Sequence, residues 1–306
     1  MHIEDFRATS SHLVVSVRGG SSTADQPQGG ADGVAELIVT DRDGKNQRTL
    51  PLPGDGTVTN LQSADRGDAI GYTFTDAAIG TEGARESMLF TMSLKDRAAE
   101  PAPVEITGAD SRVEQWRFVP DTDRILLLGF DSSLWLTGAG GDATSLGTAV
   151  GLEGVVGSTA LVDRMEGLVA LDLTDGTEQP LVAPDAEPGL LRTVVPVPGG
   201  GSVRLYAAPD GNGIPSLSVV TWVGDDGTSR VLDRAPSTDS VIRTCVSPNG
   251  RYAATVVAPD IVDNPYDGYL LPMPERVETH IVEIATGDEV VALTGFDSSW
   301  CRVPPQ

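Results

Sequence analysis

Short β-rich segments recur in pairs along the chain, and this repeat constrains the fold more than any other feature of the sequence. Each pair reads as a hairpin, with a strand-like run, a polar or glycine-containing turn and a second strand-like run. Asp-Gly and Gly-Gly turns are typical of β-hairpins because glycine accepts a positive φ. Hairpins of a first type cover residues 3–18, 58–75, 112–130, 152–164, 192–208 and 241–258. Hairpins of a second type cover residues 35–52, 86–107, 132–149, 167–183, 216–233 and 279–295.

The two hairpin types alternate six times, which defines six four-stranded units. The turns of the second type lie near residues 43, 96, 140, 175, 226 and 287, and their mean spacing of about 49 residues is typical of propeller blades. A small sheet cannot bury both of its faces alone, so neighbouring blades must supply the core. The sequence therefore predicts an all-β fold, a six-bladed β-propeller of four-stranded antiparallel blades, as a single domain over residues 1–306. Seven blades or two stacked β-sandwiches are the alternatives.

The charge of the chain excludes one class of partner. Acidic residues outnumber basic residues 44 to 21, which gives a formal net charge of −23. Such a charge repels phosphate backbones and anionic membrane surfaces, so we expect no nucleic-acid partner.

No window approaches the roughly 18–20 apolar residues of a membrane span, and the first residues are unlike a secretory signal. We expect a monomer, and an anchor or export signal encoded upstream of Met1 stays open.

Two motifs carry a resemblance to a known kind of propeller. Residues 247–253 read SPNGRYA, and residues 41–50 read DRDGKNQRTL. These motifs resemble the TolB-type and WD-repeat-like propellers of bacteria, whose blades have a Ser-Pro-Asp-Gly-Arg turn before a short apolar strand. The propeller of the actinobacterial lipoprotein LpqB is a similar kind of domain. The resemblance implies a propeller fold, but the N-terminal domain of TolB has no counterpart here, so no role in envelope assembly is carried over.

The C-terminal tail repeats the register of the last blade. Residues 300–304, WCRVP, match residues 244–248, TCVSP, with each cysteine three residues before a proline. The tail is therefore expected to form an extra innermost strand that pairs with the other end of the chain and closes the ring. Residues 3–9 also look like an innermost strand, so the sequence leaves open which of the two segments takes that place.

Equivalent positions on adjacent blades would bring the two cysteines, Cys245 and Cys301, close enough for a disulfide. Such a bond would stabilise ring closure by roughly 3–4 kcal/mol, and it indicates a location outside the cytoplasm. Two buried reduced thiols in a cytoplasmic protein are the alternative. Alkylation and mass measurement with and without reductant distinguish the two, because two free thiols in the native protein would contradict the disulfide.

Familiar catalytic and metal-binding motifs are missing from the sequence. It contains no G-x-S-x-G elbow, P-loop, Cys-x-x-Cys or sialidase-type Asp box. The histidines His12 and His280 are expected to be structural or solvated. We expect no cofactor, although calcium is an option at Asp260, Asp263 and Asp267, which form the best cluster of carboxylates. Asp-Gly turns also form without a metal, and this is the alternative explanation of the cluster.

Long loops between the two hairpins of a unit are the most informative functional feature. Such loops occur at residues 19–34, 76–85 and 259–279, and a closed ring would bring them together on one face. Long loops in compact domains are usually functional or disordered. The third loop mixes Pro and Asp with apolar and aromatic residues, a composition that suits a contact surface. Its candidate contact residues are Tyr266, Tyr269, Leu270 and Met273; a loop folded back over the ring is the alternative.

Three functions are consistent with these features. The first is a non-catalytic extracytoplasmic propeller that binds a protein or a cell-surface polymer through the long-loop face. The second is a hydrolase or lyase that uses acidic residues in the central channel, with or without calcium. The third is the sensor domain of a membrane-anchored protein. The sequence does not identify the ligand or partner.

Overall fold

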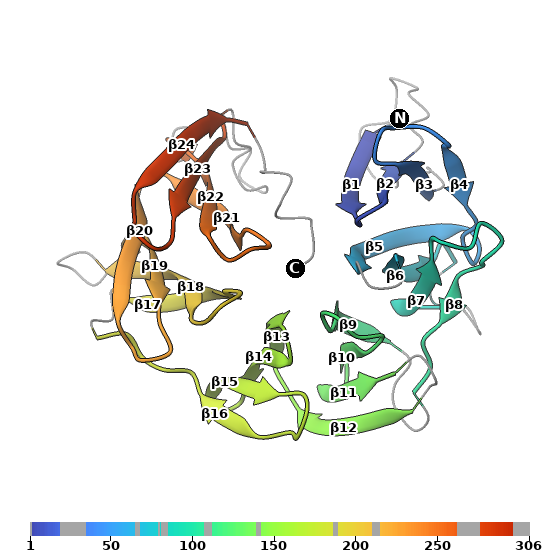
Figure 1. Ribbon diagram of the computed structural model, residues 1–306, viewed down its shortest axis with the longest axis horizontal. Coiled ribbons are helices and arrows are strands. Elements are labelled where there is room, and N and C mark those ends of the chain that lie inside the picture. Colours follow the sequence, from blue (N-terminus) through green and yellow to red (C-terminus); the bar gives the residue numbers. More distant parts are fainter. Residues whose placement is uncertain are drawn as a thin grey trace. The chain divides into compact units, whose positions relative to one another are not determined.

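The computed structural model describes residues 2–18, 35–64, 68–78, 80, 85–106, 112–138, 142–185, 189–209, 215–261 and 276–295. These residues form six four-stranded antiparallel sheets, and no α-helix occurs among them. Within each sheet, four consecutive strands lie side by side in chain order (Figure 1). The protein is therefore an all-β, six-bladed β-propeller with four-stranded antiparallel blades, as the hairpin repeat predicts. We call the strands of each blade A to D in chain order.

The blades fall into two compact units, the first ending at Leu152 and the second beginning at Glu153. The prediction of one domain over residues 1–306 stays a prediction.

The first unit holds blades 1 to 3. Blade 1 consists of β1 (His2–Ala8), β2 (His12–Arg18), β3 (Ala35–Asp41) and β4 (Arg48–Leu50). Blade 2 consists of β5 (Gly56–Ala64), β6 (Ala69–Asp76), β7 (Met88–Ser93) and β8 (Ala102–Pro103). Blade 3 consists of β9 (Val113–Phe118), β10 (Ile125–Gly129), β11 (Ser133–Thr137) and β12 (Ala143–Thr148).

The second unit holds blades 4 to 6. Blade 4 consists of β13 (Gly151–Val156), β14 (Thr159–Arg164), β15 (Gly167–Asp172) and β16 (Glu178–Pro180). The first two residues of β13 lie before the unit boundary. Blade 5 consists of β17 (Leu190–Pro196), β18 (Ser202–Pro209), β19 (Pro215–Val223) and β20 (Ser229–Pro236). Blade 6 consists of β21 (Ser240–Val246), β22 (Tyr252–Ala258), β23 (Glu278–Glu283) and β24 (Glu289–Thr294).

The A–B turn of blade 6 shows how the SPNGR motif produces local structure. The Gly250 N–H donates to Ser247 O at 2.8 Å, and the Ser247 N–H donates to Tyr252 O at 2.8 Å. Gly250 has a φ of 69°, a conformation that strains residues with a Cβ. A Cβ at Gly250 would also lie 2.1 Å from the carbonyl oxygen of Pro198 in the A–B turn of blade 5. The glycine therefore permits both the turn and its close approach to the next blade.

Blades 2 and 3 pack through one large side chain. Trp116 on β9 is fully buried, and its ring lies over Gly71 of β6, where a Cβ would come within 2.5 Å of the ring. The Gln62 side chain donates from Nε2 to the carbonyl oxygen of Trp116 at 2.6 Å. Since the glycine leaves the space that the indole ring fills, this pair of residues determines how closely the two sheets approach.

The two faces of blade 5 differ in character because side chains alternate along a strand. Val203 on β18 and Val220 on β19 belong to an apolar cluster that includes Ala253 and Val282 of blade 6. Ser202 and Arg204 project from the other face of β18. The blade thus has an apolar face toward blade 6 and a partly polar face with a buried charge.

Candidate functional site

The strands on either side of the B–C connection of blade 6 confirm that this connection is long. β22 ends at Ala258 and β23 begins at Glu278, whereas β14 and β15 of blade 4 are joined between Arg164 and Gly167. Ala258 and Val277 are both buried, so the ends of the connection are fixed in the blade. The predicted contact residues Tyr266, Tyr269, Leu270 and Met273 lie outside the described residues, and their role stays a prediction.

The candidate calcium cluster is described at one position only. Asp260 is exposed and has a φ of 53°, and its backbone N–H donates to Asp239 Oδ1 at 3.0 Å. Asp263 and Asp267 lie outside the described residues. Among the residues that the structure does describe, no group of three His, Cys, Asp or Glu side chains is placed to hold a metal ion. Calcium binding therefore stays a prediction.

The predicted disulfide is likewise described at one end. Cys245 on β21 is 8% exposed and packs with Ala254 and Ile281 inside blade 6. Its predicted partner, Cys301, lies outside the described residues, as does the whole tail from residue 296. The disulfide and the ring-closing strand both stay predictions.

His12 joins two blades of the first unit. Its Nδ1 donates to Oδ2 of Asp68, a carboxylate that is 1% exposed in the A–B turn of blade 2. Thr9 and Ser11, in the A–B turn of blade 1, donate their hydroxyls to the same carboxylate. These contacts place His12 in a link between blades; the sequence leaves a structural or a solvated role open for it.

His280 on β23 faces two carboxylates. Its Nδ1 lies 2.9 Å from Asp233 Oδ2 on β20, and its Nε2 lies 3.6 Å from Glu278 Oε2. Burial alone would lower the pKa of His280, but the hydrogen bond and charge of Asp233, with smaller effects from Glu278 and Glu289, raise that pKa above its ordinary value. His280 therefore links blades 5 and 6, and Asp233 favours its protonated form.

Replacing Asp233 with asparagine is expected to lower the pKa of His280, measured by NMR titration of the imidazole. The folded pKa is above the unfolded one, so the stabilisation is fully present below the unfolded pKa of about 6.5 and is lost as pH rises through the folded pKa. Asp233→Asn should therefore lose stability mainly below a pH of about 6.5, where the stabilisation is fully present in the unmodified protein. The exposed Asp43, changed to asparagine, is the control; an unaltered His280 titration in Asp233→Asn would contradict the assignment.

The most distinctive described feature is a cavity between blades 4 and 5, within the second unit. Its volume is about 290 Å³. Blade 4 contributes Leu161 from β14 and Ala170 from β15. Blade 5 contributes Ser202 and Arg204 from β18 and the glycine turn at residues 199–201. A second cavity, of about 480 Å³, lies between blades 2 and 3 of the first unit, where Glu105, Phe118 and Asp123 are among its lining residues. The first cavity has a buried charge, that of Arg204, in its wall.

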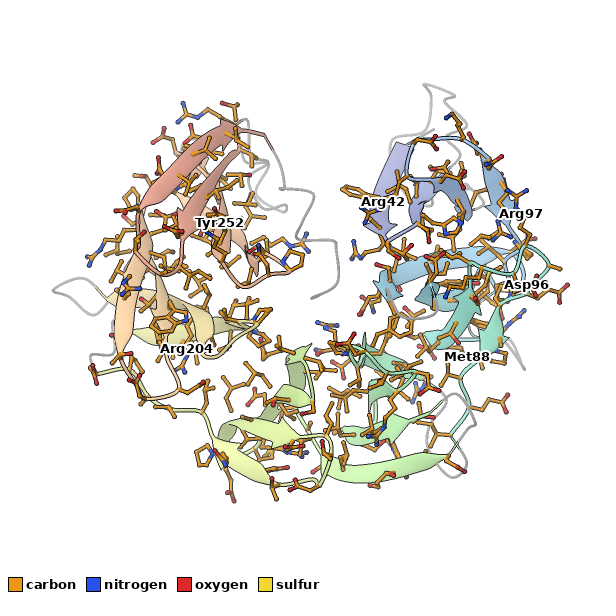
Figure 2. All side chains as sticks on the ribbon, in the orientation of Figure 1. Arg42, Met88, Asp96, Arg97, Arg204 and Tyr252 are labelled. Carbon is orange, nitrogen blue, oxygen red and sulfur yellow. The ribbon has the colours of Figure 1, made fainter. Side chains whose placement is uncertain are left out.

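Arg204 lies in the second strand of blade 5, where Figure 2 labels it, and is only 3% exposed. Its Nε donates to Ser202 Oγ at 2.9 Å, which is the one hydrogen bond of its side chain to the described part of the chain. No described carboxylate forms an ion pair with it. Across the β18–β19 ladder, Arg204 pairs with Thr221, whose buried hydroxyl likewise has no hydrogen-bond partner among these residues.

Sequence reasoning missed Arg204, although a signal for it exists. Counted from the A–B turn, the corresponding positions of the second strand hold Leu127 in blade 3 and Thr255 in blade 6, and both of these are buried. Arg204 stands between Val203 and Leu205, at a strand position where the other blades predict an uncharged, buried side chain. Comparison of the blades position by position would have singled it out.

The fold and these features define the class of the protein, a six-bladed β-propeller with a charged cavity between two of its blades. No protein-family model matches the sequence, and no curated protein matches it significantly. The class is therefore defined by the fold and not by a relative. In the part of the chain that the structure describes, no helix is long and apolar enough to cross a membrane.

Proposed function

We propose that this protein is a non-catalytic binding propeller that acts outside the cytoplasm and holds a protein or a cell-surface polymer. The B–C loop of blade 6 provides the contact surface, with Tyr266, Tyr269, Leu270 and Met273 as its contact residues. The proposal includes kinship with the TolB-type propellers of bacteria, supported by the SPNGRYA motif. A propeller fold is consistent with binding, since its rigid blades can display loops of very different lengths.

The observation that carries the proposal is the contrast between the blade 6 loop and its frame. β22 and β23 are paired from Tyr252 with Glu283 to Val257 with Glu278, and most of the β22 side chains are buried. Connections of this length are uncommon in compact domains and are usually either functional or disordered. Aromatic residues and methionine are enriched at protein interfaces, whereas lysine, which this loop lacks, is depleted there.

The extracytoplasmic location rests on the predicted disulfide between Cys245 and Cys301. Disulfides persist in oxidising compartments and are rare in the cytosol. The net charge of −23 also supports a partner other than nucleic acid. Mass measurement of the alkylated protein, with and without reductant, tests this part of the proposal independently of any partner.

The binding role is tested by substituting the loop in the full chain. Tyr266→Ala combined with Tyr269→Ala should reduce recovery of cross-linked partners from envelope extract about tenfold or more, because buried aromatic residues often dominate interfaces. The melting temperature should stay within about 2 °C of the unmodified protein, as for most surface substitutions. Met165→Ala is the matched control, since Met165 is 90% exposed in the short B–C turn of blade 4. A large loss of stability with unchanged recovery would show instead that the loop covers its own blade.

A further inference from the structure

We propose that the cavity between blades 4 and 5 is a binding site for a small organic molecule with one carboxylate group and an apolar body. Arg204 binds the carboxylate, and the apolar side chains of both blades surround the rest of the molecule. This site lies within the second unit and does not depend on the blade 6 loop, so its test and that of the proposed function are independent.

The buried charge of Arg204 is the first step of the argument. Taking an ion out of water costs several kcal/mol unless a partner compensates for it, and buried charges in proteins are normally paired. The guanidinium has five N–H donors, and the hydrogen bond to Ser202 uses only that of Nε. The four N–H groups of Nη1 and Nη2 therefore have no acceptor among the described residues, although Arg204 lines a cavity that can hold one.

The geometry of the guanidinium indicates the ligand group. Two parallel N–H donors match the two oxygens of a carboxylate or of a phosphate, and such bidentate pairs are among the strongest hydrogen-bonded pairs in proteins. The cavity distinguishes between the two anions. Asp225 also lines it, with Oδ1 held by the Gly201 N–H at 2.9 Å, and this negative charge disfavours a dianion more than a monoanion.

The remaining lining indicates the body of the ligand. Leu161 is 5% exposed and Val223 is fully buried, and with Ala170, Leu181 and Pro196 they form the apolar part of the wall, which also includes the polar Thr159 and Gln179. A volume of about 290 Å³ lies at the small end of the range for small-molecule sites. A largely apolar wall beside a cation that no described carboxylate pairs with fits a small carboxylate with a hydrocarbon chain better than it fits a sugar or a nucleotide.

Hexanoate is a suitable probe, and its binding to the full chain is measured by calorimetry at constant ionic strength. We expect saturable binding at concentrations up to about 10 mM, no binding of hexan-1-ol, and weaker binding of inorganic phosphate. Arg204→Met should weaken hexanoate binding by about 10- to 100-fold, the effect of losing a hydrogen-bonded charge. Arg192→Met is the matched control, because Arg192 is an exposed arginine of the same blade and should leave binding unchanged.

A second readout separates a binding role of Arg204 from a structural one. An unpaired buried cation destabilises the free protein, so Arg204→Met should raise the melting temperature without ligand by roughly 2 °C or more. Absence of saturable hexanoate binding to the unmodified protein would overturn the proposal. Phosphate binding more tightly than hexanoate would overturn the ligand class. A lower melting temperature of Arg204→Met with unchanged binding would assign Arg204 to the packing of the blades instead.

Discussion

Replacing Trp116 with alanine is expected to lower the free energy of unfolding by about 3–5 kcal/mol, the usual cost of removing a large buried aromatic side chain. The ring is fully buried, contacts Gly71 on the neighbouring blade and lies edge-to-face with Phe118 at a centroid distance of 5.1 Å. Its removal leaves a cavity between two sheets that cannot collapse without shifting one of them. Denaturant unfolding monitored by circular dichroism measures the change.

Two further variants show whether the effect comes from the packing of the ring against Gly71. Trp116→Phe keeps an aromatic ring and removes a buried indole N–H that has no acceptor among the described residues, so it should cost much less than the alanine variant. Gly71→Ala should destabilise the protein by about 1–3 kcal/mol through overpacking. In the Trp116→Ala background the added methyl group has space, so its cost should largely disappear. Additive effects of Gly71→Ala and Trp116→Ala would contradict the contact.

The fold could be predicted from the sequence because its determinants are local and repeated. Each hairpin has its own strand pattern and turn, as the Gly250 turn illustrates. Because the pattern occurs six times, it can be recognised even though some blades match it poorly. Contacts between blades could not be predicted in this way. The pairing of Gly71 with Trp116 joins positions far apart in the sequence, and neither residue belongs to a turn or a motif.

The same distinction between local features and contacts between blades applies to the candidate site. The length of the blade 6 loop is a property of the sequence, and strand bounds at Ala258 and Glu278 agree with it. The cavity at Arg204 exists only after two blades pack, since Leu161 and Ala170 come from one sheet and Arg204 from the next. The repeat places this arginine at a strand position that is buried in other blades; only the fold shows that it lines a cavity and that no described carboxylate pairs with it.

Asp68 links blades 1 and 2, and its replacement by asparagine is expected to lower the free energy of unfolding by about 2–4 kcal/mol. Its buried carboxylate accepts from Thr9 and His12 and, at 2.8 Å, from the Ser11 hydroxyl. Hydrogen bonds to a charged group are worth more than neutral ones, and donors left unsatisfied in the interior add to the cost. An amide has one acceptor oxygen and directs an NH₂ group at donors, so it cannot replace this arrangement.

Asparagine is the informative substitution at this position because Asp68 has a φ of 52°, and asparagine adopts that conformation as readily as aspartate does. Any loss of stability therefore reports on the carboxylate and not on backbone strain. Asp260→Asn is the matched control, since Asp260 has a similar φ of 53° but is exposed, and its change should stay within about 0.5 kcal/mol. If urea unfolding gives Asp68→Asn and Asp260→Asn the same stability, the blade 1 turn is held by packing alone. A large difference instead establishes that one carboxylate holds the A–B turns of two blades together.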